Sequence, residues 1–234
     1  MTMAGTISIV IPVFNGEAFL AEAIDSILRQ ADSVLEIIIV DDGSTDRTPV
    51  IAQSFGPPIR YVRQDNQGPA AARKSGVRLA KSEIIGFLDA DDLWCAGMLA
   101  EQLAVLAAKP ECDVVKGLTQ FIHELPGDDG MLSYQPKGEP LIFWNLSGTL
   151  YRRSAFDRAG LLNETMRFGE DFDWVNRARE HGVGTEVLDR VVQYHRRHEG
   201  NMTRGRGFRD LNGFGIIRNA MLRRRRTAGE GDGQ

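Results

Sequence analysis

The feature that most constrains this chain is an alternation of apolar, β-branched runs with segments of helical character over its first hundred residues. The strand-like runs are residues 6–14, 35–40 and 84–88, with a shorter one at 60–63. The helical segments between and after them are residues 19–28, 69–79 and 98–108. Strands that alternate with helices form βαβ units around a parallel sheet. We therefore predict an α/β fold with a central, mostly parallel sheet flanked by helices.

Two of these strand-like runs end in clusters of aspartates. Asp41 and Asp42 follow one run, and Asp89, Asp91 and Asp92 follow another. Ligands bind at the carboxyl ends of the strands in such sheets, so both clusters fall at the expected binding edge. Aspartate is also a common helix cap, which accounts for one or two of them. Crowded carboxylates repel one another, and they are suitable ligands for Mg²⁺ or Mn²⁺. The clusters therefore favour a metal site that binds a diphosphate.

Composition and known motifs exclude several other classes of protein. With 42% hydrophobic residues and a net charge of −4, the chain does not resemble the strongly basic domains that bind nucleic acid. Neither a GxxxxGK[ST] nor a GxGxxG motif is present, which removes the main support for an ATPase or a dinucleotide-binding enzyme. Cys95 and Cys112 are too few for a disulfide framework. With no signal peptide and no apolar run of about 18 residues, a cytoplasmic protein is expected.

The second half of the chain is less regular. Strands are predicted at 112–121, 146–151 and 187–194, and helices at 154–159, 169–181 and 213–226. Residues 124–140 are rich in Gly, Pro and Asp, so we expect a long loop there. Residues 227–234 are glycine-rich and are predicted to be a flexible tail.

A series of motifs, taken in order, resembles glycosyltransferase family 2, whose members have the GT-A fold. These motifs are residues 8–15 (SIVIPVFN), 40–46 (VDDGSTD), 66–73 (NQGPAAAR), 87–92 (FLDADD), 148–153 (GTLYRR), 169–174 (GEDFDW) and 197–203 (RHEGNMT). The resemblance covers about residues 6–203. It implies a Rossmann-like GT-A fold in one domain, residues 1–226. Its first half, to about residue 110, would bind a nucleotide-sugar, and residues 111–226 would form a smaller, mixed acceptor-binding portion.

The resemblance also implies roles for single residues on the donor side. Residues that would line the nucleotide pocket or approach the nucleotide and its diphosphate are Pro12, Phe14, Asn15, Asp41, Asp42, Asn66 and Arg73. Asp42 would accept a hydrogen bond from the base, with Asp41 nearby. Asp89 and Asp91 match the Asp-x-Asp motif that binds ribose and the metal–diphosphate unit. His198 would contact the metal or the diphosphate, with His195 as the alternative.

Sugar transfer with inversion needs a base that takes a proton from the acceptor hydroxyl. Glu170 and Asp171 lie at the start of a predicted helix, where acidic residues are also favoured by the helix dipole. Local sequence alone leaves these two explanations equally supported. The resemblance identifies Asp171 as the general base, with Glu170 as second choice.

The expected activity is transfer of a sugar from a nucleotide-diphosphate sugar to an acceptor hydroxyl, with Mg²⁺ or Mn²⁺ at the leaving diphosphate. A UDP-sugar is the first choice of donor, followed by dTDP- and GDP-sugars. The acceptor is a carbohydrate, a lipid-linked molecule or another hydroxyl compound. Two alternatives remain, a sugar-nucleotide nucleotidyltransferase and a non-catalytic nucleotide-sugar binding protein. The first would need a glycine-rich basic loop after the first strand, where residues 12–16 read PVFNG. The oligomeric state is left open, a dimer included.

Four consecutive arginines, Arg223–Arg226, end the last predicted helix. Their simplest role is favourable charge at a helix C-terminus together with solvation. Attraction to anionic lipid is the alternative, and it would suit a lipid-linked acceptor. Peripheral association with the inner face of a membrane is therefore a second hypothesis for location.

Overall fold

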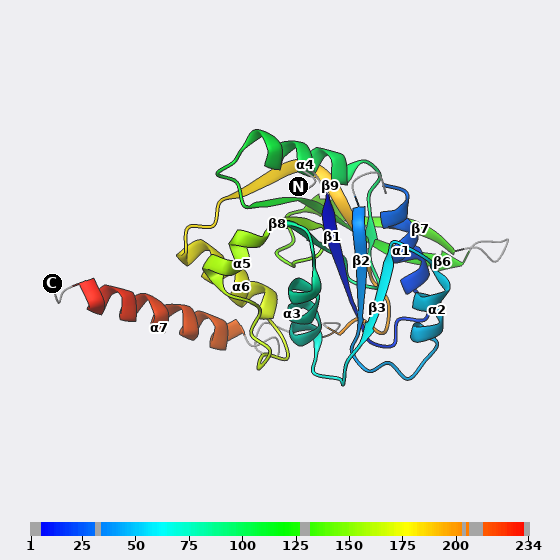
Figure 1. The fold of residues 1–234 in the computed structure, drawn as a ribbon, viewed down its shortest axis with the longest axis horizontal. Coiled ribbons are helices and arrows are strands. Elements are labelled where there is room, and N and C mark those ends of the chain that lie inside the picture. Colours follow the sequence, from blue (N-terminus) through cyan, green and yellow to red (C-terminus); the bar gives the residue numbers. More distant parts are fainter. Residues whose placement is uncertain (1–5, 31–33, 127–131, 203–204, 206–212, 232–234) are drawn as a thin grey trace.

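The first half of the chain forms four parallel strands, which make up one side of a nine-stranded sheet and end at its edge strand. The computed structural model describes residues 6–30, 34–126, 132–202, 205 and 213–231. Strands β1 (Ile7–Val13), β2 (Val34–Asp41), β3 (Ile59–Arg63) and β4 (Ile84–Phe87) pair in the order β3-β2-β1-β4, all parallel (Figure 1). All seven residues of β1 are buried. A strand that is covered on both faces has a nearly continuous apolar sequence. The apolar run at residues 6–14 therefore predicted a buried strand inside the sheet.

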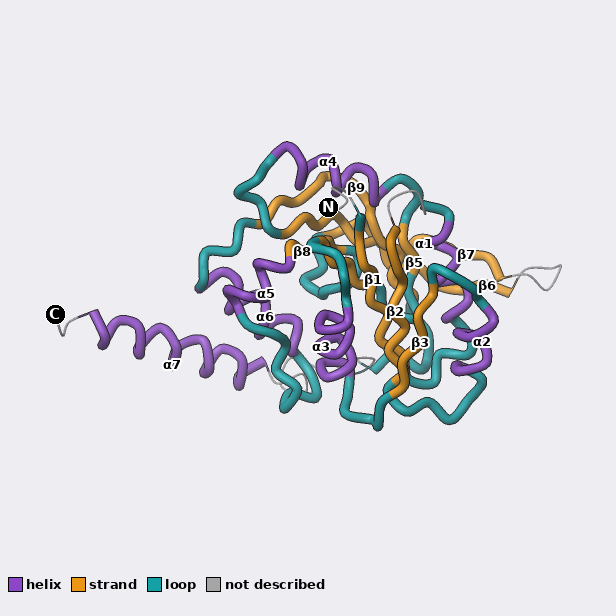
Figure 2. Tube along the Cα trace, viewed as in Figure 1, coloured by secondary structure: helices purple, strands orange, loops and turns teal. Residues whose placement is uncertain are grey.

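Helices cover both faces of the sheet (Figure 2). One apolar cluster joins the sheet to α1 (Leu20–Leu28), α2 (Thr48–Ser54) and α4 (Met98–Ala108). A second cluster joins it to α3 (Pro69–Leu79), α5 (Arg153–Ala159) and α6 (Glu170–Glu180). Ile9 and Ile11 belong to the first cluster and Val10 to the second, because successive side chains of a strand point to opposite faces. The predicted α/β layering is confirmed.

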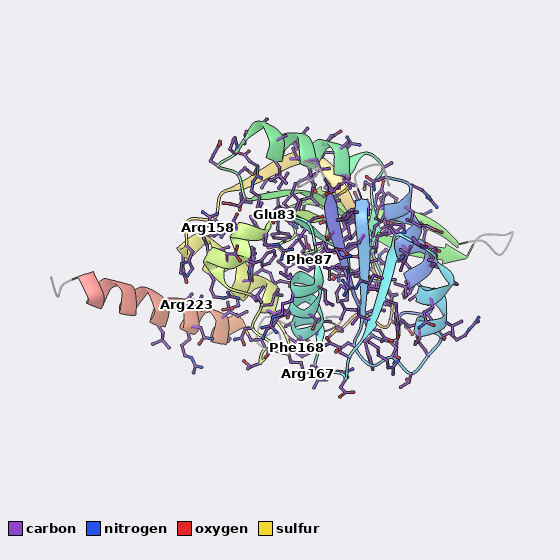
Figure 3. The ribbon with its side chains drawn as sticks, in the orientation of Figure 1. Glu83, Phe87, Arg158, Arg167, Phe168 and Arg223 are labelled. Atoms are coloured by element: carbon purple, nitrogen blue, oxygen red, sulfur yellow. The ribbon has the colours of Figure 1, made fainter. Side chains whose placement is uncertain are left out.

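The remaining strands extend the sheet as a smaller, mixed portion. They are β5 (Leu93–Trp94), β6 (Val114–Pro126), β7 (Leu132–Leu141), β8 (Thr149–Arg152) and β9 (Thr185–Arg196). Beyond β4 the order is β8-β6-β9-β5, with β7 paired to β6. β6 and β9 are parallel, and the other pairs of this portion are antiparallel. In Figure 3, Phe87 lies between the sheet and its helices, where it packs edge-on against Tyr151 and Phe156.

The long loop predicted at 124–140 is wrong where the structure describes the chain; residues 127–131 lie outside the described residues. β6 continues to Pro126, and β7 runs antiparallel to it with Pro136 opposite Ile122. Proline has no backbone N–H to donate to a neighbouring strand, so within a sheet it is found mainly in edge strands. Among the described strands β7 pairs with β6 and with no other, which meets that condition. The two-residue strand β5 was also missed, because it is too short to show a period.

The last helix, α7 (Gly213–Gly231), continues five residues beyond the predicted end at Arg226. Ala228 and Glu230 are good helix formers, and each interior glycine costs only about 1 kcal/mol. Residues 232–234 of the predicted tail lie outside the described residues. α7 projects from the body of the fold and ends far from the sheet (Figure 1). Among the helices that the structure describes, none has the length and apolarity needed to cross a membrane.

Close packing of α3 on β1 depends on Gly76, and this generates a stability prediction. A Cβ atom at Gly76 would collide with the buried side chain of Val10. Gly76→Val should lower the free energy of unfolding by about 2 kcal/mol or more, because the helix must move off the sheet. Gly56 is exposed, and a Cβ atom there meets nothing within 4 Å. Gly56→Val is therefore the control, with an expected change below about 0.5 kcal/mol. Urea denaturation measures both, and equal losses would contradict the packing argument.

Candidate functional site

The two aspartates after β2 organise the loops at the carboxyl edge of the sheet. Asp41 is fully buried and accepts hydrogen bonds from Ser44 N (2.8 Å), Tyr61 OH (2.6 Å) and Arg63 Nη1 (3.1 Å). Asp42 accepts hydrogen bonds from the loop before α3, through Gln64 Nε2 at 2.8 Å, Gln67 N at 3.0 Å and Gly68 N at 2.7 Å. Both carboxylates therefore hold the loops of this edge in place, a role that the sequence did not predict.

The end of β1 is joined to the same loops. Asn15 has a positive φ of 52°, a conformation that asparagine tolerates better than most residues. Its backbone N–H donates to Ser44 Oγ at 2.9 Å, and its Oδ1 accepts from Thr45 N at 2.8 Å. Pro12 is buried within β1, whereas Phe14 is 51% exposed. The backbone of the exposed Asn66 packs against Gly43. The predicted pocket residues thus share one edge, with the Phe14 ring accessible.

Arg73 connects three of the predicted site residues. This guanidinium on α3 is 5% exposed. It donates to Asp89 Oδ1 at 2.6 Å, after β4, and to Glu170 Oε1 at 2.9 Å, at the start of α6. Its Nη1 lies 3.6 Å from Asp171 Oδ1. Arg73 therefore brings the donor-side aspartate and both candidate bases to one point, although they are far apart in the sequence.

The environment of Asp171 suits a proton acceptor. Burial raises the pKa of this carboxyl above its usual range, the Arg73 guanidinium opposes that shift, and the charges of Glu170 and Asp89 add to it. Oδ1 of Asp171 is buried and has no hydrogen-bond donor among the described residues. α6 begins after Gly169, with Glu170, Asp171 and Asp173 in its first turn. The helix-start role and the base role are thus compatible with each other.

The two histidines of β9 and the following turn have different partners. His198 Nε2 lies 3.1 Å from Asp91 Oδ2, and the ring packs at a tilt of 39° against Phe19 with centroids 4.4 Å apart. His195 Nδ1 lies 2.9 Å from Asp92 Oδ2. Asp92 is fully buried, which raises its pKa despite the opposing effect of His195. Burial lowers the pKa of His195, but the combined effect of Asp92, Asp91 and Asp89 outweighs it, so the net shift is upward. His198 is therefore the histidine beside Asp91, and His195 pairs with a buried carboxylate.

Asp91 and His198 suit a divalent metal better than the full predicted set does. No three His, Cys, Asp or Glu side chains of the described residues are grouped as a metal site. Asp89, the third predicted ligand, is held by Arg73. Mg²⁺ normally takes one or two protein ligands together with substrate phosphates and water. Asp91 and His198 are 30% and 17% exposed, which leaves room for such partners. These two residues fit a metal that a diphosphate completes.

A short buried segment, residues 145–147, links the two halves of the site. Lys116 of β6 is 2% exposed and donates to Asn145 O (3.1 Å), Asn145 Oδ1 (3.2 Å) and Thr149 Oγ1 (3.1 Å). Ser147 Oγ accepts from Asp89 N at 3.0 Å, and the N–H of Leu146 lowers the pKa of Asp171. Sequence reasoning missed this segment. The available signal was Lys116 itself, a charged residue inside the apolar run after Asp113.

Comparisons with known proteins agree with this fold. The family model described as glycosyl transferase family 2 matches residues 8–162. The uncharacterized glycosyltransferase EpsJ of Bacillus subtilis is 31% identical over 220 residues, 86% of this chain and 64% of EpsJ. The minor teichoic acid biosynthesis protein GgaA of the same organism is 29% identical over 72% of this chain and 42% of its own. Staphylococcus aureus TarS 1–349 in complex with UDP-GlcNAc superposes with a TM-score of 0.76 at 19% identity, covering 93% of this chain and 66% of that one.

The fold is therefore of the kind found in TarS, and in this chain it is a mostly parallel sheet with helices on both faces. The chain belongs to glycosyltransferase family 2. It spans less than two thirds of the length of the curated relatives EpsJ and GgaA.

The buried Lys116 generates a prediction about pH. Burial lowers the pKa of its ammonium group from 10.5 to about 8. Between these values the unfolded chain binds more protons than the folded one, so Lys116 makes stability rise with pH. The free energy of unfolding of the wild type, relative to Lys116→Met, should increase by about 1–2 kcal/mol between pH 7.5 and pH 10. Urea denaturation at both pH values measures it. A difference that does not change with pH would contradict the lowered pKa.

Proposed function

We propose that this protein is an inverting glycosyltransferase that moves a sugar from a nucleotide-diphosphate sugar to an acceptor hydroxyl. The observation that carries the proposal is the convergence of Asp89, Glu170 and Asp171 on the buried Arg73, at the carboxyl edge of the sheet. Family membership supports it. TarS has been solved with UDP and with UDP-GlcNAc, which supports a UDP-sugar as the donor to test first, ahead of dTDP- and GDP-sugars.

The donor would lie along the edge formed by the ends of β1, β2 and β4. The exposed ring of Phe14 offers a stacking surface for the base, since aromatic faces pack well against flat rings. Pro12, Asn15, Asp41, Asp42 and Asn66 would form the wall of the nucleotide pocket. Asp89, held by Arg73, would face the ribose and the diphosphate.

Asp171 would act as the general base on the acceptor. As the acceptor oxygen attacks C1 of the sugar, its proton passes to the Asp171 carboxylate. The bond from C1 to the diphosphate oxygen breaks, and its electron pair leaves with the nucleoside diphosphate. The raised pKa of Asp171 supports this role, because a base works best when its pKa lies near the working pH. Glu170 keeps its hydrogen bond to Arg73 and so would orient the guanidinium.

Asp91 and His198 would hold a Mg²⁺ or Mn²⁺ ion, which would neutralise charge on the departing diphosphate. Asn201 donates to Asp91 Oδ2 at 3.1 Å, and the tilted ring of Phe19 packs against the His198 ring. These two contacts orient both ligands. A sugar-nucleotide nucleotidyltransferase has less support, because the segment after β1 has no basic residue to hold a triphosphate.

Donor binding should depend on the metal. Mn²⁺ with UDP should raise the thermal unfolding midpoint, and EDTA should abolish that rise; a ligand at 100 times its dissociation constant stabilises by about 2.7 kcal/mol. In Asp91→Asn, most of the metal-dependent rise in the unfolding midpoint should be lost. Differential scanning fluorimetry measures both, with Asp157→Asn on the exposed side of α5 as the control. An undiminished Mn²⁺-dependent shift in Asp91→Asn would remove Asp91 from the metal site. A shift with a nucleoside triphosphate alone would favour the nucleotidyltransferase.

Removal of the base should separate binding from chemistry. Asp171→Asn should retain the UDP-induced shift and lower the rate of sugar transfer by roughly 10²–10⁴-fold, the usual contribution of a general base. The measurement is release of UDP from UDP-sugars in the presence of a panel of hydroxyl acceptors. Glu170→Gln tests the second candidate in the same assay. A loss below threefold in Asp171→Asn, with a large loss in Glu170→Gln, would assign the base to Glu170.

A further inference from the structure

One face of α7 is anchored to the body of the protein. Ile216 is 5% exposed. Arg223, labelled on α7 in Figure 3, donates through Nε to Glu180 Oε2 at 2.6 Å and through Nη1 to Asp173 Oδ1 at 3.2 Å. Both acceptors belong to α6. Arg223, the first of the four consecutive arginines, is therefore an internal anchor and is not available as a group to an external partner.

The other side of α7 is apolar and faces outward. Its large exposed side chains are Phe214 (66% exposed), Ile217 (45%) and Met221 (58%). Spacings of three and four residues place Phe214, Ile217 and Met221 on one face of a helix. The exposed Arg218 lies between them, and position 225 follows it by seven residues, about two helical turns. This face, called the apolar strip below, carries the exposed Ile217 and Met221 with the exposed Arg218 beside them.

Charge in this part of the chain differs from charge elsewhere. Residues 203–226 contain eight arginines and one aspartate, although the whole chain has a net charge of −4. Positive charge is thus concentrated in the segment of the sequence that contains most of α7, and the rest of the sequence is acidic. A second copy of this chain would bring the same positive segment to the interface, and like charges would oppose its docking. An anionic lipid surface complements both the basic residues and the apolar strip.

We propose that α7 binds the surface of an anionic membrane, lying in the plane of the interface. Ile217 and Met221 enter the boundary between headgroups and acyl chains, and Arg218 pairs with anionic headgroups. Arg223 keeps α7 attached to α6 while the opposite face binds lipid. The inference concerns a surface away from Arg73 and does not depend on the proposed reaction.

Co-sedimentation of the full chain with vesicles tests the proposal without donor or acceptor. The protein should sediment with vesicles of phosphatidylcholine and phosphatidylglycerol, but not with pure phosphatidylcholine, and 0.5 M NaCl should reduce the binding. Arg218→Ser with Arg225→Ser should weaken binding by roughly 30-fold, on the scale expected for two basic residues near an anionic surface. Ile217→Ser with Met221→Ser should also weaken it at least tenfold, because apolar contact adds to the electrostatic attraction.

The control is Arg47→Ser with Val50→Ser, which removes one exposed arginine and one exposed apolar side chain at α2. It should bind like the wild type. Circular dichroism should show that all variants keep their fold, since the changed side chains of Ile217, Arg218 and Met221 are exposed. Absence of binding to anionic vesicles, or equal binding by all variants, would overturn the proposal. So would a lipid-free dimer, seen by light scattering, that Ile217→Ser with Met221→Ser dissociates, because the strip would then be a self-association surface.

Discussion

The buried charge of Arg73 is the constraint on which the candidate site depends. A guanidinium removed from water is tolerated only with well-placed opposite charges, because its desolvation costs several kcal/mol. Here Asp89 and Glu170 are within hydrogen-bond distance, and Asp171 is slightly further away. α3 can carry that guanidinium to the sheet edge because Gly76, one turn further on, lets the helix lie against Val10 of β1. A packing detail in the core thus sets the position of the charged centre.

The turn after β4 divides its aspartates among separate tasks. Asp89 faces Arg73, Asp91 faces His198, and Asp92 is fully buried beside His195. Gln193 and the backbone N–H of Arg196 also donate to Asp92, so this carboxylate ties the turn to β9. The carboxylate that is most buried has the structural task, and the more exposed Asp91 remains available to a ligand. One short motif therefore both joins two strands and presents a binding group.

The parallel half and the mixed half meet at residues 145–147. Lys116 holds this segment from one side, and Ser147 contacts the backbone of Asp89 on the other. A buried lysine with neutral acceptors is costly, and the nearby charges of Asp171 and Asp89 offset part of that cost by favouring its ionised form. Residues 145–147 therefore contact both Asp89 and Asp171, and the charge of Lys116 beside them interacts with the same two carboxylates.

The sequence by itself determined the parallel half of the fold and the family. Residues 69–79 and 98–108 form helices with the predicted bounds, and the apolar runs form buried strands. Both kinds of element could be predicted because the spacing of apolar residues within a short segment indicates helix or buried strand. Its ordered motifs were sufficient to indicate a glycosyltransferase of family 2. Tertiary structure alone decided which distant groups meet. The convergence on Arg73, the choice of His198 over His195 beside Asp91, the pairing of β7 with β6 and the outward face of α7 are all long-range outcomes. They depend on packing between segments far apart in the chain, which no local spacing records.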